Sequence, residues 1–324
     1  MRYLTLPPIS TPFSKIALGS TNFGTTISQS TAWHMLDAFF LDQGKTLDTA
    51  RVYGQTDSEG RSTSERIIGQ WIRKNGIRNQ ITLITKGLHP SPDGSSRFSY
   101  KNLMLDINRS REELETDFFD LWFFHRDDPS LPVAEIMEMV APLVQSGVIR
   151  ALGASNWTVS RIEEANQYAQ EHGLPLFIVS EIQWSLATST PAAWGDSTLV
   201  CMDETSLAWY RQQNMPVFAY SSQARGFFSK AIEHGFARLQ EKTRTRFYSA
   251  ENLKKLERVR TLATNLHLSP AAIVTAYITN ETPSSVAIVG CSSVEQLKDT
   301  LSGGDVILTP SQLAFLNQGE YDAT

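Results

Sequence analysis

Four residues able to transfer or stabilise a proton each stand close to the end of a short apolar run: Asp48, Tyr53, Lys86 and His125. An aspartate and a lysine balance each other's charge, which favours their pairing because a lone buried charge is strongly penalised. A tyrosine beside that pair would have its phenolate stabilised by the ammonium group. Its pKa would then fall from about 10 toward a range useful for a general acid. These residue types predict proton transfer if one fold brings them together.

A second set of polar residues follows the later apolar runs, in the order Ser155, Asn156, Gln183, Tyr220 and Ser221. In an eight-fold βα barrel the carboxyl end of every strand faces the active-site mouth. Such a barrel would gather both sets at one end of the molecule. Taken one at a time, the charged residues fit a structural salt bridge at a strand end equally well, and His125 fits a buried core histidine.

Short β-branched runs alternate with amphipathic segments along the chain, and these elements must position the polar residues. Strands are predicted at 16–19, 46–48, 81–85, 119–124, 148–154, 176–183, 216–220 and 285–289. Helices are predicted at 30–42, 64–74, 100–114, 133–145, 159–172, 203–213, 250–266, 269–279 and 294–301. The strands are continuous apolar runs, which is typical of parallel strands buried on both faces.

Alternating strands and helices form either an open doubly wound sheet or a closed barrel. Eight strand–helix units, with no G-x-G-x-x-G after the first strand, favour the barrel. We therefore predict a single (β/α)8 TIM barrel, an α/β fold, over residues 1–324, with a core at about 15–301 and a C-terminal extension at 302–324. Tyr3, Leu4 and Leu6 are expected to close the bottom of the barrel.

The composition argues against several classes of protein. The chain has 324 residues, with 29 Lys and Arg against 34 Asp and Glu, and a net charge of −5. A mildly acidic chain without a clustered basic face does not fit nucleic-acid or membrane-surface binding. Two cysteines exclude a disulfide scaffold, and six scattered histidines indicate no metal site. No apolar run approaches the ~18 residues of a membrane span and no leader pattern is present, so a cytoplasmic protein is expected.

Seven blocks of sequence, in register from about residue 47 to about residue 297, resemble the aldo-keto reductase superfamily. The blocks are LDTARVYG (47–54), SERIIGQW (64–71), ITLITKG (81–87), DLWFFHRDD (120–128), SGVIRALGASNW (146–157), FAYSSQARG (218–226) and AIVGCSSVEQL (287–297). The resemblance implies a (β/α)8 barrel that binds a nicotinamide dinucleotide in extended form, without a Rossmann domain. This agrees with the barrel predicted from the strand–helix pattern.

The resemblance implies that Asp48, Tyr53, Lys86 and His125 form the catalytic tetrad of that family. The implied reaction transfers a hydride from the nicotinamide to an aldehyde or ketone carbon, while Tyr53 protonates the developing alkoxide. Lys86, paired with Asp48, would tune Tyr53. His125 would hydrogen-bond the carbonyl oxygen, as donors do in an oxyanion hole. The implied function is therefore NAD(P)H-dependent reduction of a small-molecule carbonyl substrate.

The resemblance also implies a cofactor site. Ser155, Asn156 and Gln183 match residues that hold the nicotinamide carboxamide. Tyr220 matches the aromatic residue stacked on the nicotinamide ring, and Ser221 begins the loop that grips the pyrophosphate. The same loop and the last βα loop supply the further candidates Gln223, Gly226, Gly290, Ser292, Gln296 and Asp299.

NADP is the predicted cofactor, with NAD as the alternative. Gly290 and Gln296 stand where some branches of the family carry Lys and Arg beside the adenosine 2′-phosphate. The last-loop pattern resembles another NADP-binding branch, in which basic residues of the long loop after the seventh strand help to hold the phosphate. The candidates for that role here are Arg225, Lys230 and Arg246.

The substrate pocket is expected to include Phe23, Arg126, Trp157 and Trp184. The tryptophans fit core packing equally well, and residues 126–128 fit a solvated cluster at the rim of the site. Two other functions remain open alternatives: a cofactor-bound redox sensor or regulatory subunit with little turnover, and a phosphate-handling barrel lyase or isomerase. No feature of the sequence specifies the substrate or the oligomeric state.

Overall fold

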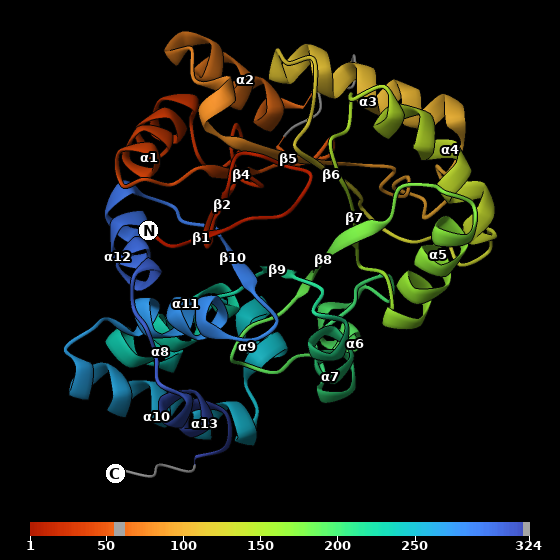
Figure 1. Ribbon diagram of the computed structural model, residues 1–324. Coiled ribbons are helices and arrows are strands. Elements are labelled where there is room, and N and C mark those ends of the chain that lie inside the picture. The colour runs from red at the N-terminus through yellow and green to blue at the C-terminus, as the bar shows by residue number, and fades with distance from the viewer. Residues whose placement is uncertain (55–61, 320–324) are drawn as a thin grey trace.

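Eight parallel strands form a closed barrel in the computed structural model, which describes residues 1–54 and 62–319 (Figure 1). Their order around the barrel is β10–β3–β4–β5–β6–β7–β8–β9, so sequence neighbours pair and the last strand closes on the first. The strands are β3 (Ile16–Gly19), β4 (Thr46–Asp48), β5 (Thr82–Gly87), β6 (Leu121–Phe124), β7 (Leu152–Ser155), β8 (Phe177–Gln183), β9 (Val217–Tyr220) and β10 (Ser285–Val289). The predicted (β/α)8 barrel is confirmed.

Helices surround the barrel, and the structure describes thirteen of them within those residues (Figure 1). They are α1 (Gln29–Leu41), α2 (Thr63–Asn75), α3 (Tyr100–Leu114), α4 (Val133–Gln145), α5 (Val159–Glu171), α6 (Pro191–Trp194), α7 (Glu204–Gln213), α8 (Phe227–His234), α9 (Glu241–Phe247), α10 (Ala250–Leu266), α11 (Pro270–Asn280), α12 (Val294–Leu301) and α13 (Pro310–Gln318). Helix α13 packs against α10, outside the ring of helices that touches the strands. Within the described residues, no helix combines the length and apolar character needed to cross a membrane.

Apolar side chains form two cores, one on each side of the strands. Ile84, Leu121, Phe123 and Phe218 fill the inside of the barrel, and a larger set packs between the strands and the helices. This two-sided burial explains why the strands read as continuous apolar runs. A polar side chain inside the barrel therefore needs a partner, because water does not reach it.

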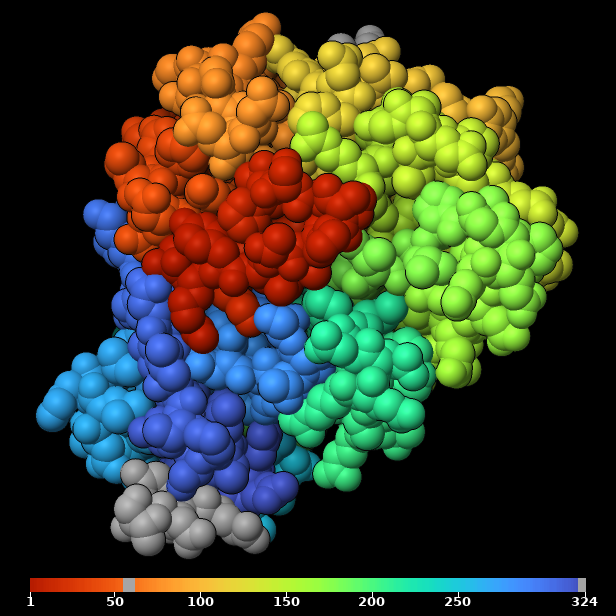
Figure 2. Space-filling view, viewed as in Figure 1, coloured from red at the N-terminus to blue at the C-terminus, as the bar shows by residue number. Residues whose placement is uncertain are grey.

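A two-stranded antiparallel hairpin closes the amino-terminal end of the barrel, as expected from the first residues of the chain. Strand β1 (Tyr3–Leu4) pairs with β2 (Phe13–Ser14). Leu6, Ile9 and Phe13 are buried against the inner core. Figure 2 shows this amino-terminal segment, in red, lying across the middle of the visible face. The open mouth with the strand ends is therefore at the opposite end of the barrel.

Several predicted boundaries differ from the observed ones. Strand β5 extends to Gly87, so Lys86 lies inside the strand. The predicted strands 119–124 and 148–154 are shorter, because their first residues meet only in an isolated bridge between Phe119 and Ile149. Helices α6, α8, α9 and α13 are not among the predicted ones. Neither α8 nor α9 has an N-cap side chain that accepts a hydrogen bond, but α6 and α13 begin after the capping residues Thr190 and Thr309, so for these two the start signal was overlooked.

Candidate functional site

The strand ends place the four proton-handling residues at the mouth of the barrel. Asp48 is the last residue of β4, Lys86 lies near the end of β5, and His125 directly follows β6. Tyr53 lies in the segment after β4, whose backbone is tied to β5 because the Arg51 N–H donates to the carbonyl of Lys86. These positions come together because parallel strands all present their carboxyl ends at the same end of a barrel.

Lys86 is fully buried, and three oxygen atoms surround its ammonium. Its ammonium donates to Asp48 Oδ1, to the carbonyl oxygen of Thr49 at 3.1 Å, and lies 3.2 Å from Glu181 Oε1. The pKa of Lys86 is raised, because the two carboxylates outweigh the effect of burial. Lys86 is therefore a permanent cation at the base of the site.

Glu181, on β8, is a member of this cluster that the sequence analysis missed. It is 1% exposed, and its second oxygen, Oε2, has no hydrogen-bond partner among the residues that the structure describes. A signal was available, because Glu181 and Gln183 are two residues apart on one strand and must project to the same face. An acid in an otherwise apolar strand, on the face of a candidate site residue, points into the barrel.

Tyr53 lies beside this cluster, but its pKa moves in the direction opposite to the prediction. The Lys86 ammonium is 5.2 Å from the centre of the phenol ring. Desolvation at the barrel mouth nevertheless outweighs Lys86 and raises the pKa of Tyr53 to about 12, helped by the negative charges of Asp48 and Glu181. The expected fall in pKa was wrong because it counted the ammonium and ignored burial, the largest effect, together with the carboxylates beside the ammonium.

His125 is a neutral hydrogen-bonding group in this environment. Its pKa lies well below the ordinary value of 6.5, first because of burial and then because of the nearby cations Arg126 and Lys86 and the ring of His89. The His125 ring stands edge-to-face with Tyr53 at a centroid distance of 5.7 Å, and with His89 at 4.8 Å. Its buried Nδ1 has no partner among the described residues. His125 is thus next to Tyr53 without adding charge.

Three of the predicted carboxamide and ring-stacking residues form one hydrogen-bonded group. Asn156 Nδ2 donates to Ser155 Oγ at 3.1 Å, and Asn156 Oδ1 accepts from Tyr220 Oη at 2.7 Å. Asn156 has a left-handed backbone, with φ of 58°. Gln183 is buried one strand away, where its amide lies 3.4 Å from Ser185 Oγ. These contacts fix the polar wall of the mouth on the side of β7 to β9.

The segment after β9 has an unusual backbone. Ser221, Ala224, Arg225 and Gly226 all have positive φ, between 48° and 79°. Left-handed residues next to helical ones turn successive N–H groups to one side, which makes a concave site for an anion. Gln223 supports the segment, since its amide donates to Thr275 and Thr300. A pyrophosphate therefore fits the chemistry of this loop.

Arg225, Lys230 and Arg246 gather around this loop. No ion pair within the described ranges engages any of the three, and each retains partial or full exposure. The guanidinium of Arg246 lies 4.0 Å from the centre of the Trp194 ring. Burial lowers the pKa of Arg246, and the nearby positive charge of Arg225 lowers it further. Positive charges that lie together without carboxylates fit a phosphate group.

The last βα loop offers fewer groups for binding a cofactor than its sequence pattern suggests. The side chain of Gln296 turns back to accept from the backbone N–H of Ser292 at 2.8 Å, within its own loop. Gly290 is exposed, and a Cβ atom there would meet no atom within 4 Å. Asp299 is half-buried on α12. This loop offers open space and a carboxylate.

The predicted substrate residues are distributed between the mouth and the core. Arg126 is 8% exposed, with its guanidinium bonded to the carbonyl of His125 at 2.8 Å and to Thr198 at 2.9 Å. The expectation of a solvated cluster was therefore wrong for Arg126, because residues 196–198 cover it. Trp157 is fully buried against Phe124 and fits the packing alternative. Phe23 and Trp184 are also buried, at 1% and 3% exposure.

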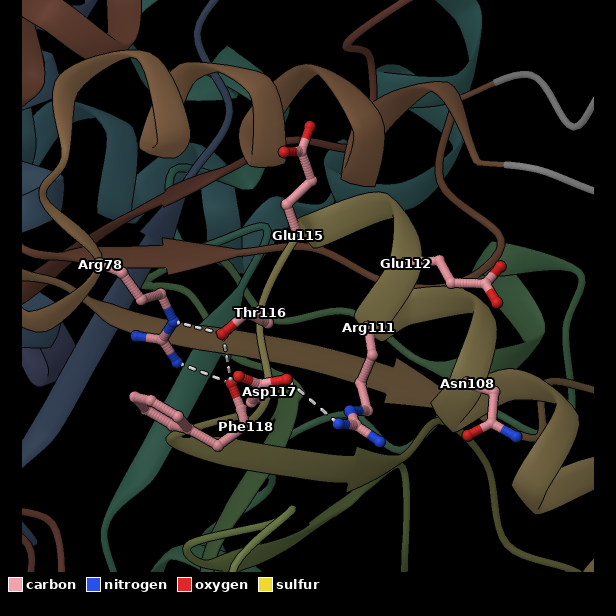
Figure 3. A pocket seen from close by; sticks show the side chains of 8 residues that line it. All are labelled: Arg78, Asn108, Arg111, Glu112, Glu115, Thr116, Asp117 and Phe118. Atoms are coloured by element: carbon pink, nitrogen blue, oxygen red, sulfur yellow. Dashed lines mark hydrogen bonds and ion pairs between the residues drawn. The ribbon is translucent and has the colours of Figure 1, made fainter.

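A surface cavity of about 570 Å³ lies away from this site. Its lining comes mainly from the carboxyl end of α3 and from the segment between α3 and β6. Figure 3 shows Arg78 bonded to Thr116 and Arg111 bonded to Asp117 in this lining. Arg78 donates to Thr116 at 2.8 Å and pairs with Asp120. These bonds fasten the amino-terminal ends of β5 and β6. Arg78 in the lining is therefore part of the frame of the barrel. Across the described ranges, no group of three or more metal-binding side chains occurs.

Comparison with known proteins agrees with this geometry. The model of the Aldo/keto reductase family matches residues 15–318. Norsolorinic acid reductase B of Dothistroma septosporum is 26% identical over 97% of this chain and 80% of its own length. An aryl-alcohol dehydrogenase [NADP(+)] of Phanerodontia chrysosporium is 26% identical over 94% of this chain and 82% of its own. An uncharacterized oxidoreductase of Bacillus subtilis is 26% identical over 98% and 95%.

Proposed function

The chain belongs to the aldo/keto reductase family, and from that premise we propose that it is an NADP-dependent reductase that converts an aldehyde or ketone into an alcohol. The observation that carries the proposal is the meeting of Tyr53, Lys86, Asp48 and His125 at the mouth of one barrel. The names of the relatives support an oxidoreductase more generally.

Tyr53 is the proposed general acid. A phenol whose pKa is raised to about 12 keeps its proton at neutral pH, so the form that donates a proton is fully populated. The proton passes from the Tyr53 hydroxyl to the substrate oxygen, which becomes the alcohol. The phenolate left behind is stabilised by Lys86, whose ammonium lies 5.2 Å from the ring. When bound, a reduced nicotinamide dinucleotide supplies the hydride for the carbonyl carbon.

His125 is the proposed orienting group. Its neutral ring beside Tyr53 can donate a hydrogen bond to the substrate oxygen without competing for the proton that Tyr53 supplies. A donor fixed where negative charge develops stabilises the transition state more than the bound substrate. His89 packs edge-to-face against that ring, and Arg126 bonds the backbone carbonyl of His125.

The cofactor would be held along the strand ends from β7 to β9. Ser155, Asn156 and Gln183 would bind the carboxamide and Tyr220 would stack on the ring. The left-handed loop from Ser221 to Gly226 would receive the pyrophosphate. Arg225, Lys230 and Arg246 would bind the 2′-phosphate that distinguishes NADP from NAD. These three cations, which form no ion pair with the described residues, are what favours NADP.

The substrate class follows from the relatives and from the rings near the mouth. Two relatives are named for aromatic compounds, norsolorinic acid and aryl alcohols. Trp194 lies 6.5 Å from Tyr220 between ring centres, and His89 lies at the other side of the mouth. Flat aromatic aldehydes and ketones are therefore the first substrates to test.

The test is oxidation of NADPH and NADH, in parallel, with aromatic and aliphatic aldehydes and ketones. We expect turnover with NADPH and a fall of at least about 10²-fold in kcat for Tyr53→Phe, the contribution usual for a positioned acid. Binding of NADPH to the variant, followed by fluorescence, should be unchanged. Wild-type protein that binds NADPH tightly and turns nothing over would instead favour the redox sensor. Unchanged turnover in Tyr53→Phe would rule out the assigned acid.

A further inference from the structure

Two buried carboxylates share one ammonium group inside the barrel mouth. Lys86 is completely buried, and Asp48 and Glu181 are 2% and 1% exposed. The ammonium holds Asp48 by a short hydrogen bond and lies 3.2 Å from Glu181 Oε1. A second hydrogen bond goes to the carbonyl oxygen of Thr49. Three oxygen atoms therefore surround the ammonium, and two of them belong to carboxylates.

Charge counting shows that this cluster is not neutral if every member is ionised. Two carboxylates and one ammonium leave one negative charge in a place that water does not reach, which is strongly unfavourable. Arg126 is the next cation, but its guanidinium is already turned toward the carbonyl of His125 and toward Asp196. One proton on one of the carboxylates would make the cluster neutral.

The hydrogen bonds indicate which carboxylate takes that proton. Lys86 donates a hydrogen bond to Asp48, as expected for an ionised carboxylate, whereas its contact with Glu181 is an ion pair at 3.2 Å. Glu181 Oε2 has no donor among the described residues, although an ionised oxygen buried to this degree normally has one. Burial, followed by the nearby charge of Asp48, raises the pKa of Glu181 to about 8.

We propose that Glu181 carries a proton at neutral pH and acts as a positioning residue, which keeps the cluster of Asp48, Lys86 and Glu181 neutral so that the ammonium can stabilise the phenolate of Tyr53. The catalytic half of this proposal rests on the proposed reductase function. The ionisable groups that face Glu181 are Lys86 and Asp48 from β5 and β4, Arg126 after β6, Tyr53 after β4 and Tyr220 on β9.

The direction of the pH effect follows from the charge. Above about pH 8, Glu181 releases its proton to solvent. Lys86 then faces two ionised carboxylates, Asp48 and Glu181. The added negative charge opposes formation of the Tyr53 phenolate, so kcat for carbonyl reduction falls as the pH rises through this value. Glu181→Gln has nearly the same shape and is neutral at every pH. The kcat of this variant should therefore lose the decline near pH 8.

The protonated acid can be observed without turnover, by infrared difference spectroscopy of the carboxylic C=O band between pH 6 and pH 10. Wild-type protein should show a band that disappears with a midpoint near pH 8, and Glu181→Gln should lack it. Subtracting the variant from the wild type also removes the band of any other protonated acid. Glu281→Gln is the matched control, because Glu281 is also buried, at 5% exposure, but has Arg211 as its own partner at 2.9 Å. That variant should keep the band.

The two measurements separate the possible outcomes. A wild-type spectrum without this band, or a band that Glu181→Gln leaves in place, would overturn the proposal even if the protein is an active reductase. If the enzyme is active and Glu181→Gln lowers kcat by the same factor at every pH, Glu181 has only a packing role. A protein that shows the band and reduces no carbonyl compound would refute the reductase function and leave the protonation of Glu181 standing. The wild-type titration needs no variant to fold.

Discussion

At the scale of single residues, the site is controlled by how many charges surround Lys86. The ammonium faces Asp48, Glu181 and the carbonyl of Thr49. Burial has the largest effect on the pKa of Tyr53 and raises it, Lys86 acts against burial, and the carboxylates of Asp48 and, once ionised, Glu181 oppose Lys86. The tyrosine is consequently held as an acid, which suits the direction of reduction.

The same counting predicts unequal losses of stability for two neutralising substitutions. Lys86→Met leaves two buried carboxylates without their cation, so we expect it to lower the free energy of unfolding at pH 8 by about 3–5 kcal/mol. Asp48→Asn leaves Lys86 paired with Glu181 and should cost less than half as much. Urea unfolding at pH 8 and pH 5 measures both. The Lys86→Met loss should shrink at pH 5, where the carboxylates can take protons. Equal losses for the two variants would argue against a shared ammonium.

At the scale of elements, helix α2 fixes the segment that carries Tyr53. Ser62 caps α2 by accepting from the Glu65 N–H, and its hydroxyl donates to the carbonyl of Tyr53 at 2.7 Å. The backbone N–H of Ser62 donates to Glu113, on α3, at 2.6 Å. Arg51 joins Glu65 and Glu113 at 2.8 and 3.0 Å. Helices α2 and α3 thus hold the tyrosine segment from outside the barrel.

This helix junction predicts a pH dependence of stability. Burial raises the pKa of Glu113 from its ordinary 4.5 to about 7, with Arg51 acting in the opposite direction. Between these values the folded protein keeps a proton that the unfolded chain has lost, so the free energy of unfolding falls as the pH rises from 4.5 to 7. Glu113→Gln should make that slope shallower in urea unfolding measured across this range. Glu257→Gln, on an exposed face of α10, should leave the slope as it is.

At the scale of the whole molecule, an acidic chain gathers cations in one place. The net charge is −5, yet Arg225, Lys230 and Arg246 lie around one loop without an ion pair in the described part of the chain. The rest of the surface repels a polyanion at long range, so binding of a phosphate depends on these local charges. The preference between the two nicotinamide cofactors is therefore expected to depend on them.

Arg246→Ala should weaken NADPH binding at least about tenfold, which corresponds to about 1.4 kcal/mol, and leave NADH binding unchanged. The reason is that Arg246 would bind only the 2′-phosphate, which NADH lacks. Fluorescence titration gives both dissociation constants. Arg244→Ala serves as the control, since Arg244 is an exposed arginine on the same helix. Equal weakening for NADPH and NADH, or the same effect in Arg244→Ala, would remove Arg246 from the phosphate site.

The sequence by itself determined the barrel and the positions of Asp48, Tyr53, Lys86 and His125. Strand periodicity is a local property, and a parallel barrel puts every strand's carboxyl end at one mouth. It also located the loop of Ser221 and the nearby cations, through the resemblance to the family.

Only the tertiary structure decided the electrostatics of the site. Glu181 reaches Lys86 from β8 across the inside of the barrel, and no local pattern shows which strands face each other at that depth. The same holds for Arg126, which residues 196–198 cover, and for Trp157, which packs into the core. Charges and burial depend on neighbours distant in sequence, and a pKa sums over all of them. The sequence therefore predicts which residues come together, and the tertiary structure sets their protonation states.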